Sequence, residues 1–165
     1  PYTFSKDVGE DALELFSKCY GLKYSIARFY NVYGPNEHLD PNEASVIGIW
    51  RYNVENNIKC QIVGDGAQER DFIHVQDIVE GLDAIGKSNL KHDDAWELGT
   101  GSTTNINDLA LMFHERFGIN FEWVGDQKGN IRKSILINND AYDKLGWRPK
   151  KKLVHYIIIK KINVL

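Results

Sequence analysis

The sequence has few cysteines and no long apolar run. Its two cysteines, Cys19 and Cys60, are far apart and lack the spacing of a metal site, so no metal is expected. Reduced thiols in a cytoplasmic protein are the expectation, because disulfides belong to oxidising compartments. No apolar run approaches the roughly 20 residues that a membrane-spanning helix needs, so no membrane partner is expected.

The chain also lacks a strong charge imbalance and an initiator methionine. Its formal net charge is −3, which gives no reason to expect nucleic acid or an anionic membrane as a partner. The first residues do not have the pattern of a signal peptide, and none is expected. Because the chain opens without Met at what reads as the start of a helix, we interpret it as a fragment of a longer protein.

A glycine-rich dinucleotide loop is absent as well. No G-x-G-x-x-G motif occurs in the 165 residues. The nearest stretch is Gly99-Thr100-Gly101, in which the third glycine is replaced by Thr104. We interpret this stretch as a tight connection between a strand and a helix.

The sequence does contain strands that alternate with helices. Extended segments are predicted at residues 23–29, 61–63, 96–99 and 121–124, and a polar loop at 31–38. Helices are predicted at residues 2–20, 42–56, 78–87, 106–117 and 140–145, and a short helix or strand against the core at 156–159. Such alternation is typical of an α/β fold with a largely parallel sheet.

The third predicted helix carries specific expectations. Ile78, Leu82 and Ile85 should lie on its buried face. Asp77 stands at its start and is predicted to be the N-cap, because a carboxylate there accepts a bond from a free backbone N–H group. His74 is expected to be structural.

Tyr2 and Lys6 are the first chemical signal. They are four residues apart, so on a helix they share one face. A lysine ammonium near a phenol favours the phenolate, which would suit Tyr2 for proton transfer with a sugar or alcohol hydroxyl. Taken alone, the pair is a weak signal, because Tyr and Lys at this spacing are more typical of a solvated helix face.

Arg70 is the second signal, in the polar stretch that follows the turn Gly64-Asp65-Gly66. Arginine can hold a phosphate through two parallel hydrogen bonds. The alternative is that Arg70 forms a structural ion pair with Glu69 or Asp71, or anchors the loop. The residues themselves leave the two readings open.

Five motifs in order carry a family resemblance. They are Tyr2-x-x-x-Lys6, Arg28 to Pro35, Gly64 to Asp77, Glu97 to Gly101 and Leu145 to Pro149. Through them the chain, from residue 1 to about residue 150, resembles the C-terminal half of an NAD-dependent epimerase/dehydratase, an extended short-chain dehydrogenase/reductase. Within that family it is most similar to UDP-glucose 4-epimerase-like enzymes.

The resemblance implies a fold and a domain. The fold would be the C-terminal part of a Rossmann-like parallel-sheet domain plus a smaller α/β substrate-binding domain. The N-terminal glycine-rich half would be missing, and residues 1–165 would be the C-terminal portion of the family domain. The resemblance also allows a homodimer in the parent protein.

The resemblance assigns roles near the cofactor, which would be NAD. Tyr2 would be the catalytic acid/base, and Lys6 would bind the nicotinamide ribose and lower the pKa of Tyr2. Phe29 would lie in the segment that lines the nicotinamide side of the pocket.

The resemblance also assigns substrate contacts, with a UDP-sugar expected as the nucleotide sugar. Asn31 would contact its diphosphate, Gln61 and Val63 would border the base, and Arg70 would hold a phosphate. A second phosphate-binding arginine is usual before a Gly-Asp or Gly-Glu pair, but this sequence has Gln127-Lys128-Gly129-Asn130 there. Lys128 or Arg132 would have to replace it.

Two hypotheses follow. In the first, the parent protein is an epimerase that oxidises the sugar transiently with NAD, or else a 4,6-dehydratase or reductase of the same fold. In the second, the chain is a catalytically inactive nucleotide-sugar-binding fragment.

Overall fold

The computed structural model describes residues 2–40 and 44–159. Its helices are α1 (Tyr2–Tyr20), α2 (Val46–Glu55), α3 (Val75–Lys87), α4 (Ile106–Phe117), α5 (Asp140–Leu145) and the π-helix η1 (His155–Ile159). Its strands are β1 (Ala27–Phe29), β2 (Asn31–Tyr33), β3 (Cys60–Val63), β4 (Glu69–Arg70), β5 (Phe72–His74), β6 (Trp96–Leu98), β7 (Thr104–Asn105), β8 (Phe121–Val124) and β9 (Lys133–Ser134). None of the helices in these ranges is long and apolar enough to cross a membrane.

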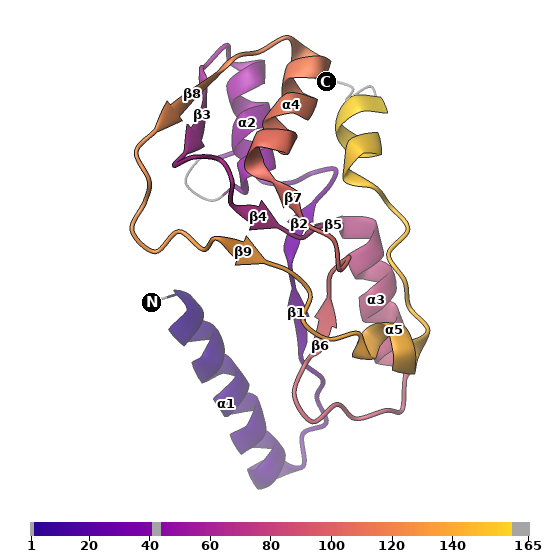
Figure 1. Ribbon diagram of the computed structural model, residues 1–165. Coiled ribbons are helices and arrows are strands. Elements are labelled where there is room, and N and C mark those ends of the chain that lie inside the picture. Colours follow the sequence, from indigo (N-terminus) through magenta and orange to yellow (C-terminus); the bar gives the residue numbers. More distant parts are fainter. Residues whose placement is uncertain (1, 41–43, 160–165) are drawn as a thin grey trace.

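The strands pair mostly in parallel, which confirms the predicted α/β class. β1 pairs with β6, β2 with β5, and β3 with β8, all in parallel. β4 lies between β7, which is antiparallel to it, and β9, which is parallel. Parallel strands need crossover connections, and Figure 1 shows the helices that provide them.

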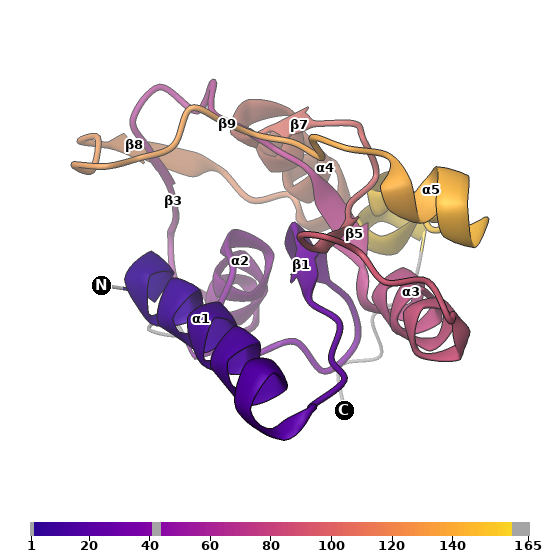
Figure 2. The same cartoon turned by 90° about the horizontal axis from the view of Figure 1, so that it is seen from below.

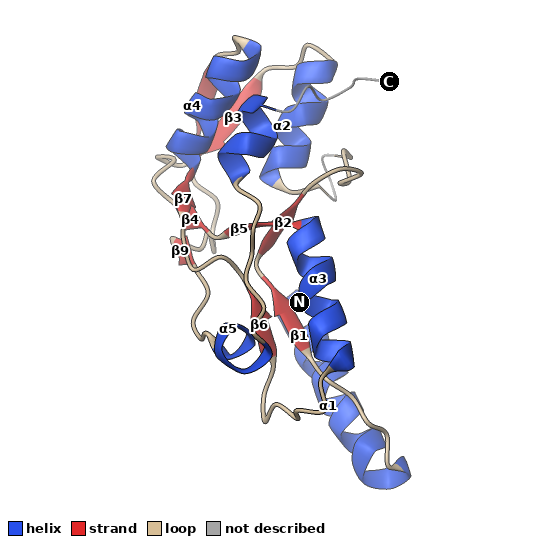
Figure 3. Ribbon diagram, turned by 90° about the vertical axis from the view of Figure 1, so that its right-hand side faces the viewer, coloured by secondary structure: helices blue, strands red, loops and turns tan. Residues whose placement is uncertain are grey.

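Two apolar clusters hold the chain together. One joins α2, α4, β3 and η1, and its largest fully buried side chain is Trp50. The other joins α3, β6 and α5, and it contains Trp96 and Trp147. Figure 3 shows the two groups of helices at different ends of the row of strands. Tyr156 and Ile157 of η1 are buried in the first cluster, as predicted for the tail.

The segment after α1 differs from the prediction. The expected strand 23–29 shortens to Ala27–Phe29, and the expected loop at 31–38 begins with a second strand, Asn31–Tyr33. The chain changes partner at Tyr30, whose backbone N–H donates to Leu98, whereas that of Asn31 donates to Asp71. Backbone pairing with β5 therefore makes a strand of residues that polar composition alone assigns to a loop.

Helix α2 also begins later than predicted. It starts at Val46, after Ser45 at the N-cap, and the predicted start at Asn42 lies outside the described residues. Ile47 and Trp50 are buried as expected.

Helix α3 corrects two predictions. Its N-cap is His74, whose Nδ1 accepts from the backbone N–H of Gln76, so the N-cap prediction for Asp77 was wrong. Asp77 instead turns inward and is fully buried. Leu82 is exposed, so its predicted burial was wrong, and the adjacent Gly81 lies on the buried face close to the Leu98 side chain.

Helix α1 is confirmed, but it packs little. None of its residues is buried. An ion pair between Arg28 of β1 and Glu10 connects it to the strands, with Nε and Oε1 3.0 Å apart. Figures 1 and 2 show the helix set apart from the layers of strands and helices.

Candidate functional site

Tyr2 and Lys6 share a face of the first turns of α1, as their spacing predicts. The Lys6 ammonium nitrogen lies 5.2 Å from the centre of the Tyr2 ring. The Tyr2 side chain is 75% exposed. The geometry therefore leaves the phenol accessible to a ligand, and the catalytic role of the pair stays a prediction.

Phe29 and Asn31 lie where β1 passes into β2. Phe29 is the last residue of β1 and is 47% exposed. The side-chain amide of Asn31 donates to the backbone oxygen of Asp71, 3.1 Å away. Because Asn31 is fixed in this way, one of its two N–H groups is already used by the fold.

Arg70 stands on β4 and makes neither of the ion pairs considered as alternatives. Its guanidinium donates to the backbone oxygen of Glu69 at 2.9 Å and to Oδ1 of Asn130 at 3.2 Å. Within the described residues it pairs with no carboxylate, since Glu69 pairs with Lys133 instead.

The half-buried position of Arg70 has an electrostatic consequence. Burial lowers the pKa of its guanidinium, because the charged form is less well solvated there. A guanidinium that is partly removed from water and held by neutral acceptors retains capacity for an anion. The role of Arg70 as a phosphate ligand stays a prediction that this geometry allows.

Arg132 is already paired. Its guanidinium makes two hydrogen bonds of 2.8 Å to the carboxylate of Asp65, in the turn that follows β3. Arg132 holds the pKa of Asp65 well below its usual range. A phosphate contact from Arg132 would have to compete with this carboxylate.

Gln61 and Val63 lie on β3 at the other side of the same turn. Gln61 is exposed and its backbone oxygen accepts from the indole N–H of Trp50. Val63 is half-buried and its backbone oxygen accepts from the side chain of Gln68. The backbone is thus used by the fold, and the Gln61 side chain is left to the surface.

The structure brings part of the predicted site together. Arg70 and Arg132 are on neighbouring segments, because β4 pairs with β9 and the N–H of Glu69 donates to the backbone oxygen of Arg132. Asn31 is linked to β4 through Asp71. Tyr2 and Lys6 lie apart on α1, and no contact joins them to Arg70 within residues 2–40 and 44–159.

Asp71 is a residue whose importance the sequence analysis missed. It is fully buried, and its carboxylate accepts hydrogen bonds from the backbone N–H groups of Thr100, Gly101 and Leu136 and from the Thr100 hydroxyl. A Cβ at Gly99 would approach its Oδ2 to 2.9 Å. The only signal in the sequence was the small residues of the Gly99–Gly101 turn, which leave room for a side chain to approach the backbone.

The same contacts decide the nature of the Gly99–Gly101 turn. The N–H groups of Thr100 and Gly101 point at a carboxylate of the protein itself. A negative ligand is therefore excluded from them by charge repulsion. The turn leads from β6 into the two-residue strand β7, which precedes α4, so it connects two strands and not a strand directly to a helix. Its N–H groups at Thr100 and Gly101 are already used by Asp71.

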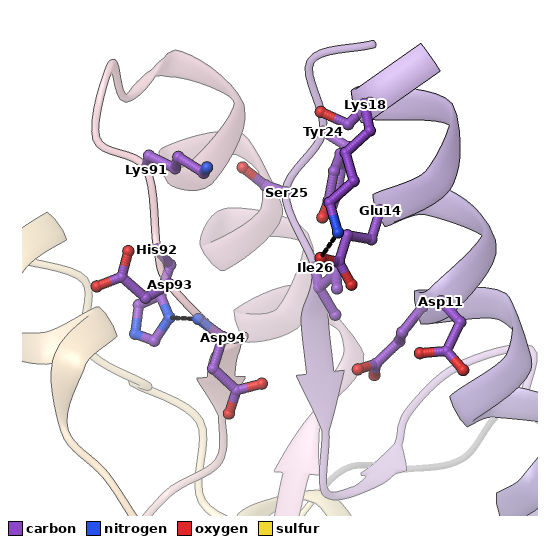
Figure 4. A pocket seen from close by; sticks show the side chains of 12 residues that line it. Asp11, Glu14, Lys18, Tyr24, Ser25, Ile26, Lys91, His92, Asp93 and Asp94 are labelled. Atoms are coloured by element: carbon purple, nitrogen blue, oxygen red, sulfur yellow. Dashed lines mark hydrogen bonds and ion pairs between the residues drawn. The ribbon is translucent and has the colours of Figure 1, made fainter. Parts of the chain in front are cut away.

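A cavity of about 410 Å³ lies between α1 and the loop before β6. Figure 4 shows that acidic side chains from both segments face it, among them Asp11, Glu14, Asp93 and Asp94. No cluster suited to a metal ion occurs in the described ranges. The cavity contains none of the predicted site residues and its charge does not suit a phosphorylated ligand.

Comparison with known proteins identifies one family of relatives. Residues 1–99 match the NAD dependent epimerase/dehydratase family. The putative UDP-glucose 4-epimerase of Methanocaldococcus jannaschii is 35% identical, over 91% of this chain and 48% of its own length. A dTDP-glucose 4,6-dehydratase of Streptomyces antibioticus is 27% identical, over 92% of this chain and 44% of its own.

A solved structure agrees with these relatives. The UDP-glucose 4-epimerase of Thermotoga maritima with UDP-glucose is 34% identical and superposes with a TM-score of 0.85. The match covers 95% of this chain and 50% of that one. The chain thus spans about half the length of the relatives that it matches.

Proposed function

Because the chain belongs to the NAD dependent epimerase/dehydratase family, we propose that it is the substrate-binding part of a nucleotide-sugar 4-epimerase. Residues 1–165 would be the C-terminal portion of the family domain. Two relatives named UDP-glucose 4-epimerase support a UDP-sugar as the substrate. The activity of the complete protein is part of this proposal, since the chain spans only half of those relatives.

The single observation that carries the proposal is that Arg70 is half-buried without a carboxylate partner in the described chain. It is a half-buried guanidinium, held by neutral oxygens, and within the described chain no carboxylate neutralises it. Asn130 fixes one of its nitrogens from the segment that precedes β9. A diphosphate would supply the missing negative charge, with charge-assisted bonds about twice as strong as neutral ones.

The other site residues follow from their positions in the family motif. Tyr2 would take and return the proton of the sugar hydroxyl at its phenolic oxygen, and the Lys6 ammonium would stabilise the phenolate. Asn31 would offer the second N–H of its amide to the diphosphate. Gln61 and Val63 would border the base, and Arg132 would contribute only after it leaves Asp65.

NAD, when bound, would accept a hydride from the sugar and return it. The residues present fit this cofactor in part. Tyr2 and Lys6 stand on one exposed helix face, as contact with a nicotinamide ribose requires, and Phe29 is exposed at the end of β1. The diphosphate cradle is not supplied by the Gly99–Gly101 turn, because Asp71 occupies its N–H groups.

A 4,6-dehydratase is the second candidate, favoured by the relative of that name. The two activities share the initial oxidation, so Arg70 has the same role in both. A nucleotide-sugar-binding chain without catalysis also requires Arg70. The test of binding therefore applies to every version of the proposal.

Titration calorimetry with UDP-glucose provides that test. Arg70→Ala should weaken binding by about 2–3 kcal/mol, the range for hydrogen bonds to a charged group. Arg70→Lys should restore part of it, because an ammonium lacks the planar fork. Arg148→Ala is the matched control, since Arg148 is exposed and stacks on Tyr142 in the α5 region. Unchanged UDP-glucose binding with a lower melting temperature for Arg70→Ala would show that Arg70 only supports the fold.

A further inference from the structure

A second cavity lies on a different part of the molecule. It has a volume of about 970 Å³. Its walls are the turn Pro35–Asn36, the start of α3, the segment Lys150–Lys152 and the first residues of η1. Figure 1 shows the yellow C-terminal segment running alongside α3. None of the residues assigned to the nucleotide sugar or to NAD lines this cavity.

The three lysines stand on a fixed backbone. The buried carboxylate of Asp77 accepts from the N–H groups of Lys150 and Lys151, at 3.0 and 2.9 Å. The backbone oxygen of Asp77 accepts from the indole of Trp147 at 3.0 Å. At the other end, the backbone oxygen of Lys152 accepts from the N–H of His155. This anchoring limits where the lysine side chains can go.

The residues that line the cavity carry an excess of positive charge. No Asp or Glu is among the residues that line it. Lys150 is neutralised by Glu80, 2.7 Å away. Lys151 and Lys152 make no ion pair with a carboxylate in the ranges that the structure describes. Lys151 and Lys152 therefore line the cavity from adjacent positions, with Glu80 close enough to Lys151 for this lysine to add to the lowering of the Glu80 pKa by Lys150. An anion in the cavity would relieve the repulsion between the two ammonium groups.

The size and the remaining walls restrict the kind of anion. A volume of about 970 Å³ is that of a small-molecule site and exceeds what a single phosphate fills. Pro35, Val75 and Tyr156 add apolar and aromatic surface. Lysine is a common phosphate ligand, and its ammonium binds as a point charge without the fixed geometry of arginine.

We propose that this cavity binds a small molecule carrying a diphosphate, held by Lys151 and Lys152. The inference is independent of the proposed epimerase function. It rests on the cavity, the anchored backbone and the unbalanced charge, and Arg70 takes no part in it.

Titration calorimetry with inorganic pyrophosphate tests the proposal on the 165-residue chain at physiological salt. Saturable binding is expected, at least about tenfold tighter than binding of orthophosphate, because two ammonium groups contact two phosphates. The double variant Lys151→Gln/Lys152→Gln should weaken pyrophosphate binding by about tenfold or more. Its melting temperature should stay within about 3 °C, because both side chains are exposed.

A matched control removes the same charge elsewhere. Lys23→Gln/Lys91→Gln changes two exposed lysines that do not line the cavity, and it should leave pyrophosphate affinity unchanged. In an Arg70→Ala background, which removes the proposed substrate site, Lys151→Gln/Lys152→Gln should still weaken pyrophosphate binding by about tenfold or more. Equal weakening in both double variants, no effect of the Lys151/Lys152 changes in the Arg70→Ala background, or no saturable binding up to about 5 mM would each overturn the proposal.

Discussion

Replacing Asp71 by alanine should destabilise the protein strongly. Its carboxylate is fully buried and connects two segments that are distant in sequence. It accepts from the N–H of Thr100 at 2.9 Å, the N–H of Gly101 at 2.9 Å and the N–H of Leu136 at 3.2 Å, and from the Thr100 hydroxyl at 2.6 Å. Asp71→Ala would leave all of these donors without their acceptor.

The magnitude depends on which donors can reach water. Gly101 is exposed, so its N–H can be solvated, whereas Leu136 is buried and Thr100 is half-buried. A buried donor left unsatisfied costs about 1–3 kcal/mol. The Thr100 hydroxyl can donate to the backbone oxygen of Ser102 instead, which leaves two buried backbone donors. Two such donors give about 2–6 kcal/mol, and we expect a loss of about 4 kcal/mol in the free energy of unfolding. Asp71→Asn keeps one acceptor oxygen and should cost about half as much.

Urea unfolding followed by tryptophan fluorescence measures this loss, since Trp96 is in the adjoining buried cluster. Asp83→Ala is the control, because Asp83 forms an exposed ion pair with Lys87 within one helix. Removing such a pair should change the unfolding free energy by less than about 0.5 kcal/mol. A loss for Asp71→Ala no larger than that of the control would refute the reasoning.

Three further outcomes are expected. In a protein of the relatives' full length, Tyr2→Phe should lower turnover by roughly 10²–10⁴-fold with nearly unchanged substrate affinity, and retention of a tenth of the wild-type rate would contradict the acid/base role. The 165-residue chain alone should bind NAD poorly in titration calorimetry, because Asp71 occupies the turn that most resembles a diphosphate cradle, and micromolar binding would be inconsistent with this. Arg132 lowers the pKa of Asp65, so the ion pair should stabilise the protein above about pH 4 and lose this effect as the pH falls. Urea midpoints measured between about pH 5 and pH 2 should contain this loss in the wild type, whereas Asp65→Asn should lack it.

The sequence predicts best those helices whose ends are marked by capping residues. Helix α4 spans Ile106–Phe117 as predicted, with Asn105 as a bonded N-cap and Gly118 in the left-handed conformation at its C-terminus. Helix α5 likewise ends at Gly146, which has a φ of 66°. Caps and left-handed glycines are local, so a single sequence contains the information needed to place them.

The errors come from contacts that are distant in sequence. Asn31 belongs to a strand only because β5 lies beside it. Asp77 has the sequence position of an N-cap, but its carboxylate accepts hydrogen bonds from backbone N–H groups 73 and 74 residues further along the chain. No local pattern reports such partners.

In the candidate site, too, local features could be predicted and long-range contacts could not. The spacing of Tyr2 and Lys6 and the family motifs could be found in the sequence, and the structure confirms that the pair shares a face. That Arg70 lacks a carboxylate partner, whereas Arg132 has one, follows from the packing of β4 against β9 and from the turn at Asp65. The sequence places several acids near both arginines and does not distinguish them.

Helix α1 has the weakest tertiary support of the elements that carry the proposed chemistry. None of its 19 residues is buried, although most of the stability of helices in proteins comes from the tertiary packing of an apolar face. Tyr2 and Lys6 are aligned only in molecules whose first turns are wound. The apparent affinity for a ligand that needs this alignment is the intrinsic affinity multiplied by the wound fraction. Whatever packs on the apolar side of α1 would therefore raise the affinity for that ligand without touching it.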